Sequence, residues 1–250
     1  MKRALILLLV LLAASIFLHA KRTIKITPLK DNVKKVYVSV EAQSMFNFLE
    51  NLKYPNKNSG ITFCVTPSIR VDYYLGSYFF VGGGLAFNTT GGDHYFISSR
   101  FDNLEGFKAS QEVRRIMSVS YVEMPLYAKV QSNYMDNWAV QGLLGFSWGV
   151  KVMASRKDTY SEFTYSKDNV EYLNGAYEET DKLRKKASLF NVAGIVEVRA
   201  LYRATNKLQL FVGTGYQGGL VNILSKKYTG DEEFHKGKPG QVIVSAGIVF

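Results

Sequence analysis

The sequence predicts an all-β protein, an eight-stranded antiparallel up-and-down transmembrane β-barrel preceded by a signal peptide. Apolar residues alternate with polar or small residues over eight segments of 10–16 residues, which is the period of a strand with two different faces. Short and long connections between these segments alternate along the chain, as in outer-membrane barrels. The composition favours strands, because the chain holds 16 Tyr, 16 Phe and 21 Gly but only 5 Pro.

The same composition excludes several other classes. A content of 47% hydrophobic and 21% charged residues excludes a mainly disordered chain. The single cysteine, Cys64, leaves no intrachain disulfide framework and no cysteine-based zinc site. A mean hydropathy of -0.05, with no second long apolar run, excludes a helical protein with several spans.

Residues 1–20 are predicted to be a signal peptide, in which the bases Lys2 and Arg3 precede an apolar stretch and Ala20 ends the segment. An uncleaved helical anchor is the alternative. Residues 21–35 form a predicted basic periplasmic arm that carries six bases and one acid, and residues 36–250 form the predicted barrel. Much of the net charge of +10 therefore lies in a short arm, so the charge does not indicate a nucleic-acid-binding face.

The eight segments are predicted to be strands that span the membrane, since each is long enough to cross a bilayer at a tilt. In chain order they are Val36–Phe48, Ile61–Leu75, Ser77–Asn88, Met117–Val130, Trp138–Met153, Leu189–Arg203, Leu208–Leu220 and Gln241–Phe250. The alternation is unbroken in the second segment and runs from Trp138 to Val152 in the fifth. It is weakest at Met117–Ser120, where the apolar residues are out of phase with the rest of the fourth segment.

Three of the segments carry small residues on the polar face, which suits the crowded interior of a narrow barrel. These residues are Gly82, Gly84 and Ala86 in the third segment, Gly145, Ser147 and Gly149 in the fifth, and Gly213, Gly215 and Gly219 in the seventh. The first and sixth segments carry charged residues on that face. The eighth ends in an aromatic residue, with Gly247 three places before Phe250, which resembles the terminal signal read by barrel-assembly machinery.

The connections predict how the barrel is oriented. Gly76, Gln131–Asn137 and Ala204–Lys207 are short, whereas Leu49–Gly60, Thr89–Ile116, Ala154–Ser188 and Val221–Gly240 are long and polar. The short turns are expected at the periplasmic side and the long loops outside the cell. With an even number of strands, both ends of the barrel fall on the periplasmic side.

Two soluble folds are the alternatives, a β-sandwich and a lipocalin-like barrel. A lipocalin-like barrel keeps its apolar face inside, whereas here the small and polar faces fit the interior and the Phe, Trp, Tyr and Val faces suit lipid. Aromatic residues near the short turns are predicted to form a girdle at the membrane interface. They are Tyr73, Tyr78, Phe80, Trp138 and Tyr202.

The inward faces carry four acids and four bases, and buried charges must be paired. We therefore predict an ion-pair network in the lumen, made of Glu41, Arg70, Asp72, Glu123, Lys129, Lys151, Glu197 and Arg199. Glu123 is expected to pair with Arg70, Lys129 or Arg199. A proton path, an ion path or a switch is the alternative function of these groups.

The sequence predicts no catalytic residue, no cofactor and no metal site. Asp93-His94 and Glu232-Glu233-Phe234-His235 both fall in long loops, where an outer-membrane protease or lipid A-modifying enzyme would place its rim residues. Neither motif is joined by a partnered serine, and two ligands do not make a metal site.

The run Ser120–Lys129, SYVEMPLYAK, resembles the Tyr-x-Glu-x-Pro-Leu strand of the PorT-like outer-membrane β-barrel family, and Gly142, Gly145 and Gly149 are similar to its following strand. The resemblance implies an eight-stranded outer-membrane barrel with no catalytic residues. The family's namesake serves the type IX protein secretion machine, so a component of secretion machinery is one alternative function.

The expected protein is a non-catalytic scaffold or partner-binding protein of the Gram-negative outer membrane. Its expected partners are outer-membrane lipid, the barrel-assembly machinery and an unidentified protein, and they do not include nucleic acid. The longest loop, Ala154–Ser188, combines charged residues with tyrosines, a composition that suits protein recognition.

Overall fold

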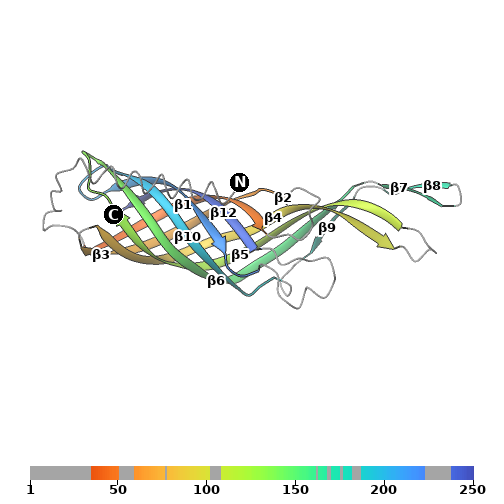
Figure 1. Ribbon diagram of the computed structural model, residues 1–250, viewed down its shortest axis with the longest axis horizontal. Helices are drawn as coiled ribbons and strands as arrows, with labels where there is room; N and C mark the ends of the chain where they lie inside the picture. Colours follow the sequence, from red (N-terminus) through yellow and green to blue (C-terminus); the bar gives the residue numbers. More distant parts are fainter. Residues whose placement is uncertain are drawn as a thin grey trace. The chain divides into compact units, whose positions relative to one another are not determined.

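The computed structural model describes residues 35–50, 59–76, 78–101, 108–161, 163–167, 170–174, 177–181, 187–222 and 238–250 (Figure 1). The predicted signal peptide, nearly all of the predicted arm and the motif at Glu232–His235 lie outside the described residues. The described residues contain no helix that is both long and apolar enough to cross a membrane.

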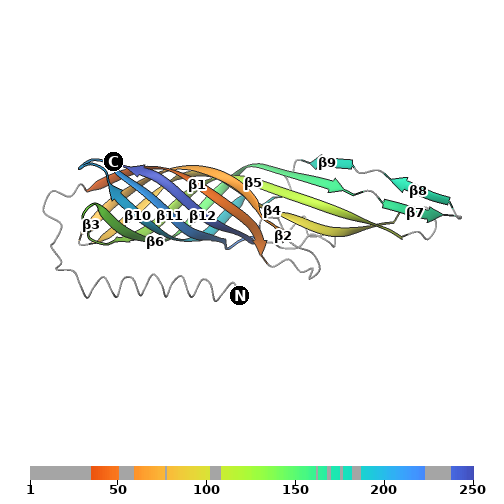
Figure 2. The ribbon, with the colours of Figure 1, turned by 90° about the horizontal axis from the view of Figure 1, so that it is seen from above.

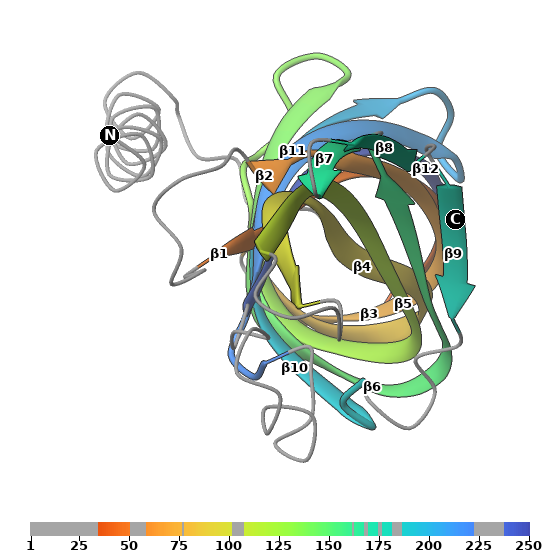
Figure 3. The same ribbon diagram turned by 90° about the vertical axis from the view of Figure 1, so that its right-hand side faces the viewer.

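Eight strands close into an antiparallel barrel, as predicted (Figures 1 and 3). They are β1 (Val36–Glu50), β3 (Thr62–Gly76), β4 (Phe79–Phe101), β5 (Lys108–Gln131), β6 (Trp138–Tyr160), β10 (Phe190–Arg203), β11 (Gln209–Gly219) and β12 (Lys238–Val249). Consecutive barrel strands pair with each other, and the pairing of β1 with β12 closes the ring. Short turns join the strands at one end, which by the usual orientation of such barrels is the periplasmic end.

Four short strands accompany the barrel. They are β2 (Ser59–Gly60), which pairs with β4, β9 (Tyr177–Asp181), which pairs with β6, and β7 (Phe163–Lys167) with β8 (Val170–Asn174), which form a separate two-stranded sheet (Figure 2). The prediction that Thr89–Ile116 and Ala154–Ser188 are loops is therefore wrong over much of their length. Strands β4, β5 and β6 are 23–24 residues long and continue through these segments.

Period-two alternation does not predict the extra length, because the polarity of the two faces changes along β5. Alternate residues stay buried from Val113 to Lys129, so the facing does not change at Met117–Ser120. On the periplasmic side of this point the exposed outer positions carry Val122 and Leu126. On the other side the outer positions carry Ser118, Ile116 and the exposed Arg114. A register shift between β5 and β6 at Ser120/Tyr121 lies at the same height. We infer that β5 faces lipid from Tyr121 toward the short turns and faces water on the other side of Ser120.

The upper parts of these strands are called the extension, defined as residues 89–101 of β4, 108–120 of β5 and 153–160 of β6. Three of its four inner positions from Val113 to Val119 on β5 are apolar and buried, and the fourth is the buried Arg115. A sheet in water keeps its apolar side chains inside, which is the reverse of a barrel wall in lipid.

The outer wall of the barrel is apolar, as predicted. Phe63, Ile69 and Phe146 are each at least half exposed, whereas Thr66 and Arg70 are buried. The girdle prediction is partly wrong, because Phe80 is buried and packs against the rings of Tyr37 and Tyr74 inside the barrel. Its neighbour Phe79 is the outward aromatic residue. Trp138 lies outward beside Tyr202, with ring centroids 4.9 Å apart.

Candidate functional site

The lumen is filled in layers, and the layer nearest the periplasmic end is apolar. Ala139, Leu201, Phe211 and Val249 form a buried cluster that packs against Tyr37 and Tyr134. Arg203 lies 3.6 Å from the centroid of the Tyr134 ring. In this turn, burial raises the pKa of the Tyr134 phenol, and the nearby guanidinium opposes the rise. Side chains therefore close the barrel at this end.

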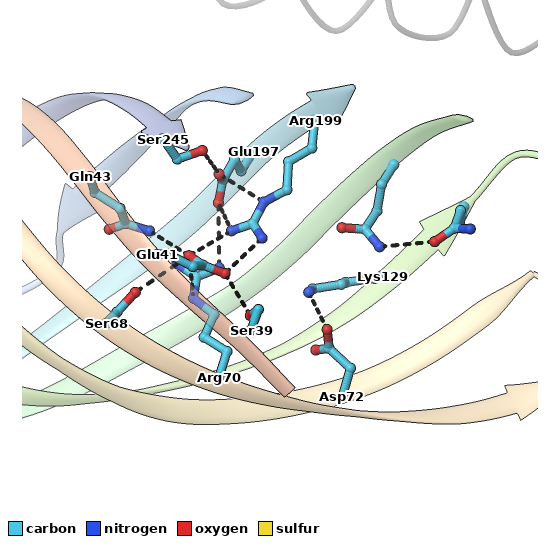
Figure 4. Close-up of polar contacts among 12 residues, drawn as sticks. Ser39, Glu41, Gln43, Ser68, Arg70, Asp72, Lys129, Glu197, Arg199 and Ser245 are labelled. Carbon is cyan, nitrogen blue, oxygen red and sulfur yellow. Dashed lines mark hydrogen bonds and ion pairs between the residues drawn. The ribbon is translucent and has the colours of Figure 1, made fainter. Parts of the chain in front are cut away.

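The next layer is an ion-pair layer built around Glu41 and Glu197 (Figure 4). Arg199 lies between the two carboxylates, with Nη1 2.8 Å from Glu41 Oε1 and Nη2 2.8 Å from Glu197 Oε2. Arg70 also reaches both acids, at 3.1 and 3.5 Å. Ser39, Gln43 and Ser68 donate hydrogen bonds to Glu41, and Ser245 donates to Glu197. Both carboxylates are thus bound by cations and by neutral donors.

A second pair belongs to the same layer. Lys129 Nζ lies 2.6 Å from Asp72 Oδ2, and both side chains are buried. The Lys129 ammonium also lies 4.9 Å from the centroid of the Tyr127 ring. The layer holds three acids and three bases, so its charges balance, and the structure brings these six residues of the predicted network into contact as ion pairs.

Two members of the predicted network behave differently. Lys151 is only partly buried, and its ammonium donates to the backbone carbonyl of Ala187. Glu123 is buried, but none of the described bases forms an ion pair with it. The prediction that Glu123 pairs with Arg70, Lys129 or Arg199 is therefore wrong, because those bases are already bound to the three acids of the ion-pair layer.

Glu123 is instead held by four neutral donors. Asn88 and Asn191 donate to Oε1 at 3.1 and 2.8 Å. Ser147 and Gln217 donate to Oε2 at 2.9 and 3.0 Å. Each carboxylate oxygen therefore accepts two hydrogen bonds, which is enough to satisfy a buried carboxylate.

These contacts belong to a ring of polar side chains that we call the amide ring. Every barrel strand contributes one residue, in strand order Asn47, Cys64, Asn88, Glu123, Ser147, Asn191, Gln217 and Gln241. Gln241 links Asn47 to Asn88, and it also donates to the backbone carbonyl of Thr89 on β4. Sequence reasoning missed the amides of this ring. Their signal is an inward Asn or Gln on each of five strands, near the end opposite the short turns in β1, β10, β11 and β12 and near the middle of the longer β4.

The extension holds further buried charge. Arg115 binds Asp158 through two hydrogen bonds of 2.7 and 2.6 Å. Asp93, half of one candidate rim motif, binds Arg114 through Nη2 at 2.8 Å. The side chain of His94 lies outside the described residues. Within the described parts of the chain, no group of three or more His, Cys, Asp or Glu is placed to hold a metal ion.

The motif that resembles the PorT-like family directs alternate side chains into the barrel. In Ser120–Lys129 the alternate residues Tyr121, Glu123, Tyr127 and Lys129 are all buried. Glu123 belongs to the amide ring and Lys129 to the ion-pair layer. The inward residues of this motif therefore fill the lumen.

These features define the class of protein. An antiparallel barrel with an apolar outer wall and a polar, charge-balanced interior is an integral protein of the bacterial outer membrane. Residues 34–225 match the family described as outer membrane protein beta-barrel domain, and the chain belongs to this family. The match concerns the outer-membrane barrel and does not single out the PorT-like group. A search of characterised proteins by sequence finds no match.

Solved structures with a related fold come from several bacteria. Neisserial surface protein A is 10% identical, with 86% of this chain and 96% of that chain covered and a TM-score of 0.40. Ail of Yersinia pestis is 12% identical, with 87% and 100% covered and a TM-score of 0.34. OprG of Pseudomonas aeruginosa is 11% identical, with 86% and 94% covered and a TM-score of 0.35. At such low identity, none of them informs on function.

Proposed function

We propose that the protein is a closed, non-catalytic outer-membrane barrel that binds a protein partner through its extracellular extension. The observation that carries this proposal is the inversion of polarity along β5, which makes the extension a water-exposed sheet rather than more barrel wall. Surface loops and the elements that they carry are where barrel proteins place function.

The filled lumen supports a closed barrel. An eight-stranded barrel has an interior just wide enough for side chains. Here the apolar layer, the ion-pair layer and the amide ring follow one another along the lumen. Reconstituted protein in planar lipid bilayers should give no stable single-channel conductance, and well-resolved channel openings would contradict this part of the proposal.

The two-stranded sheet of β7 and β8 supports a role in recognition. Its register pairs Tyr165 with Tyr172 and Phe163 with Asn174. A lone hairpin is marginally stable in water, and tyrosine supplies much of the contact area of protein-binding surfaces. The segment between β6 and β10 also carries exposed charges on β9, at Glu178 and Glu179.

The test compares two versions of the hairpin in cells. In one variant, residues 163–174 are replaced by a scrambled sequence of the same composition, and in the other only the turn between β7 and β8 is changed. Both variants should assemble with normal heat-modifiable migration. Surface cross-linking should yield one reproducible partner with the wild type and the turn variant but not with the scrambled one. Equal cross-linking by all three would contradict the proposal.

A component of secretion machinery is a second candidate, favoured by the resemblance of Ser120–Lys129 to the PorT-like strand. The burial of that motif weakens its bearing on partners, because the alternate residues contact other lumen side chains. An enzyme at the rim receives no support from Asp93, because its carboxylate binds Arg114. Loss of surface delivery of secreted proteins after deletion of the gene would favour the secretion candidate.

A further inference from the structure

The described wall of the barrel has one long break in its backbone ladders, between β3 and β4. The ladder that starts at the short turn ends with the pair Ser68–Ala86, and pairing resumes only at Gly60–Asp93, where β2 meets β4. Residues 61–67 and 87–92 form no ladder pair with each other in between. We call these two facing stretches the ladder break.

Other neighbouring strands of the described barrel pair without a comparable gap. Pro125 interrupts the ladder of β4 with β5, but pairing is complete again from Glu123 onward. Pro67 takes the first lost position at the ladder break, while it keeps its place opposite Ala42 in the ladder with β1. Proline has no N–H to donate. As Pro125 shows, however, one proline accounts for a short interruption and not for the whole break.

Side chains replace some of the lost backbone partners. The carbonyl oxygen of Thr89 accepts hydrogen bonds from Cys64 Sγ at 3.1 Å and from Gln241 Nε2 at 3.3 Å, whereas in an intact antiparallel ladder it would accept a backbone N–H. The register of Ser68–Ala86, continued along both strands, places Thr90 opposite Cys64. The Thr90 hydroxyl is buried, and it has no hydrogen-bond partner within the described part of the chain. A buried hydroxyl without a partner is costly, so a ligand that bonds to it gains free energy.

The ladder break lies where the barrel passes from lipid to water. Thr89 pairs with Ser120, at which the polarity of β5 changes, and Phe87 pairs with the lipid-facing Val122. The outward side chains of Val65 and Phe87 are exposed and apolar. The inward side chains of the ladder break are all uncharged, namely Thr62, Cys64, Thr66, Asn88 and Thr90. An amphiphile with an uncharged polar end matches both faces.

We propose that the ladder break binds an uncharged amphiphile from the outer leaflet. Its acyl chain lies on the outer wall beside Val65 and Phe87, and its polar end passes between the strands to the Thr90 hydroxyl. Entry here breaks no ladder hydrogen bond, whereas entry between intact strands would leave backbone groups without partners in lipid. An anionic head is disfavoured, because Asn88 is bound to the Glu123 carboxylate and no base is present among the inward side chains of the ladder break. The inference is independent of the protein partner proposed above.

The thiol of Cys64 reports on this site, because it is the only cysteine of the chain. The full-length protein is reconstituted in lipid vesicles, and the rate at which a bilayer-soluble maleimide modifies Cys64 is measured. The reference is the double variant Cys64→Ser with Ala193→Cys, whose thiol lies at a buried inward position with intact ladders on both sides. Cys64 should react at least about tenfold faster, because a reagent reaches the reference thiol only when ladder hydrogen bonds open. Equal rates would overturn the proposal.

Binding is measured as protection of the same thiol. Monooleoylglycerol, which has an uncharged head with hydroxyl groups and an ester, should slow the modification of Cys64 in a saturable way. Oleoyl lysophosphatidylcholine has the same acyl chain and a charged head, and it should give no protection. Neither lipid should slow the reference thiol. Equal slowing by both lipids, or no slowing by monooleoylglycerol, would overturn the proposal.

Two valine variants locate the polar end of the ligand. Thr90→Val removes the hydroxyl and should leave the unprotected rate unchanged, while the mole fraction of monooleoylglycerol needed for protection rises about three- to tenfold, as expected for one hydrogen bond. Thr66→Val is the matched control on the facing strand, because its hydroxyl already donates to Met45 Sδ, and it should keep the protection of the wild type. Undiminished protection in Thr90→Val would overturn the proposal, and the two wild-type experiments decide it even if neither valine variant folds.

Discussion

The buried ionisable side chains of the lumen each need their charge offset, and Arg199 shows how this is done. Its guanidinium binds two acids at once, Glu41 through two hydrogen bonds and Glu197 through two more. It also lies 4.3 Å from the centroid of the Phe211 ring in the apolar layer below. A planar fork suits this bridging, which an ammonium could not reproduce.

The Asp72–Lys129 pair gives the simplest prediction at this scale. Asp72→Ala leaves the buried ammonium of Lys129 without its carboxylate, and breaking a buried pair in this way costs about 3–5 kcal/mol. The double variant Asp72→Leu with Lys129→Met should recover most of that loss. Urea unfolding in lipid vesicles measures both free energies of unfolding.

The exposed pair of Lys157 in the extension with Glu178 on β9 is the matched control, with a distance of 2.8 Å. Surface pairs contribute about 0–1 kcal/mol, so Lys157→Ala should change the free energy of unfolding little. A loss in Asp72→Ala as small as that in Lys157→Ala would show that water reaches the ion-pair layer.

Gly82 gives a second prediction, because neighbouring atoms leave no room for a side chain at this position. A Cβ atom there would lie 2.5 Å from Tyr127 Cε2 and 2.8 Å from the Val71 carbonyl oxygen, and it would also meet the Asp72 carboxylate. Gly82→Ala should therefore destabilise the barrel by about 1–3 kcal/mol. Gly142→Ala is the control, since a Cβ there meets no atom within 4 Å, and its unfolding midpoint in urea should stay within error of the wild type.

At the scale of the element, one strand can serve two environments. Strand β5 keeps the same residues inward from the extension to the periplasmic turn, while the chemistry of its faces inverts near Ser120. The register shift to β6 at this point adds one residue on β6, as bulges do where a strand changes course. The change in side-chain polarity along a single strand therefore marks the inferred membrane boundary.

Spin labels along β5 test this boundary. Labels at Val122 and Leu126 should be accessible to oxygen dissolved in the bilayer, and labels at Ser118 and Arg114 to a water-soluble nickel reagent. Phe63 and Phe146 should behave like Val122, while a label at Thr66 should be shielded from both reagents. Oxygen accessibility at Arg114 equal to that at Leu126 would move the boundary and contradict our assignment of the extension to water.

The same reasoning explains what the sequence could and could not predict. Period-two alternation predicted all eight barrel strands, because lipid outside and a packed polar lumen inside impose opposite demands on alternate residues. It does not predict the extension of β4, β5 and β6, because a sheet in water reverses those demands. Phe80 has the same parity as the inward Gly82, which places its ring inside the barrel, whereas its nearness to a turn alone suggests the interfacial girdle.

The partners of buried charges were harder to predict than their positions. Inward parity placed Glu41, Asp72 and Glu123 correctly, but three bases and three acids can be matched in several ways. Which groups meet depends on the register and tilt of strands far apart in sequence, and Arg199 reaches Glu41 across 158 positions. The amides around Glu123 were not considered, since uncharged residues leave no imbalance in a charge count.

At the scale of the whole molecule, the barrel depends on one closing seam. Strand β12 pairs with β1 from Ser39–Val249 to Glu50–Lys238. Beyond this ladder, Phe250 N donates to the Val38 carbonyl at 2.9 Å and Val38 N donates to the Phe250 carbonyl at 3.3 Å. An open edge in lipid would leave backbone groups without hydrogen bonds, so the last residues of the chain complete the wall.

Two changes at Phe250 separate closure of the barrel from recognition by assembly machinery. Deleting Phe250 removes both backbone hydrogen bonds to Val38, so it should reduce the heat-modifiable fraction after refolding into pure lipid vesicles. Phe250→Ala keeps the backbone and removes only the ring, which is half exposed on the outer face. It should refold in vesicles like the wild type. In cells, where the terminal aromatic residue is the expected signal, both variants should assemble poorly, with Lys207→Ala in a periplasmic turn as the unaffected control. Normal assembly of Phe250→Ala in cells would leave backbone closure as the whole contribution of this residue.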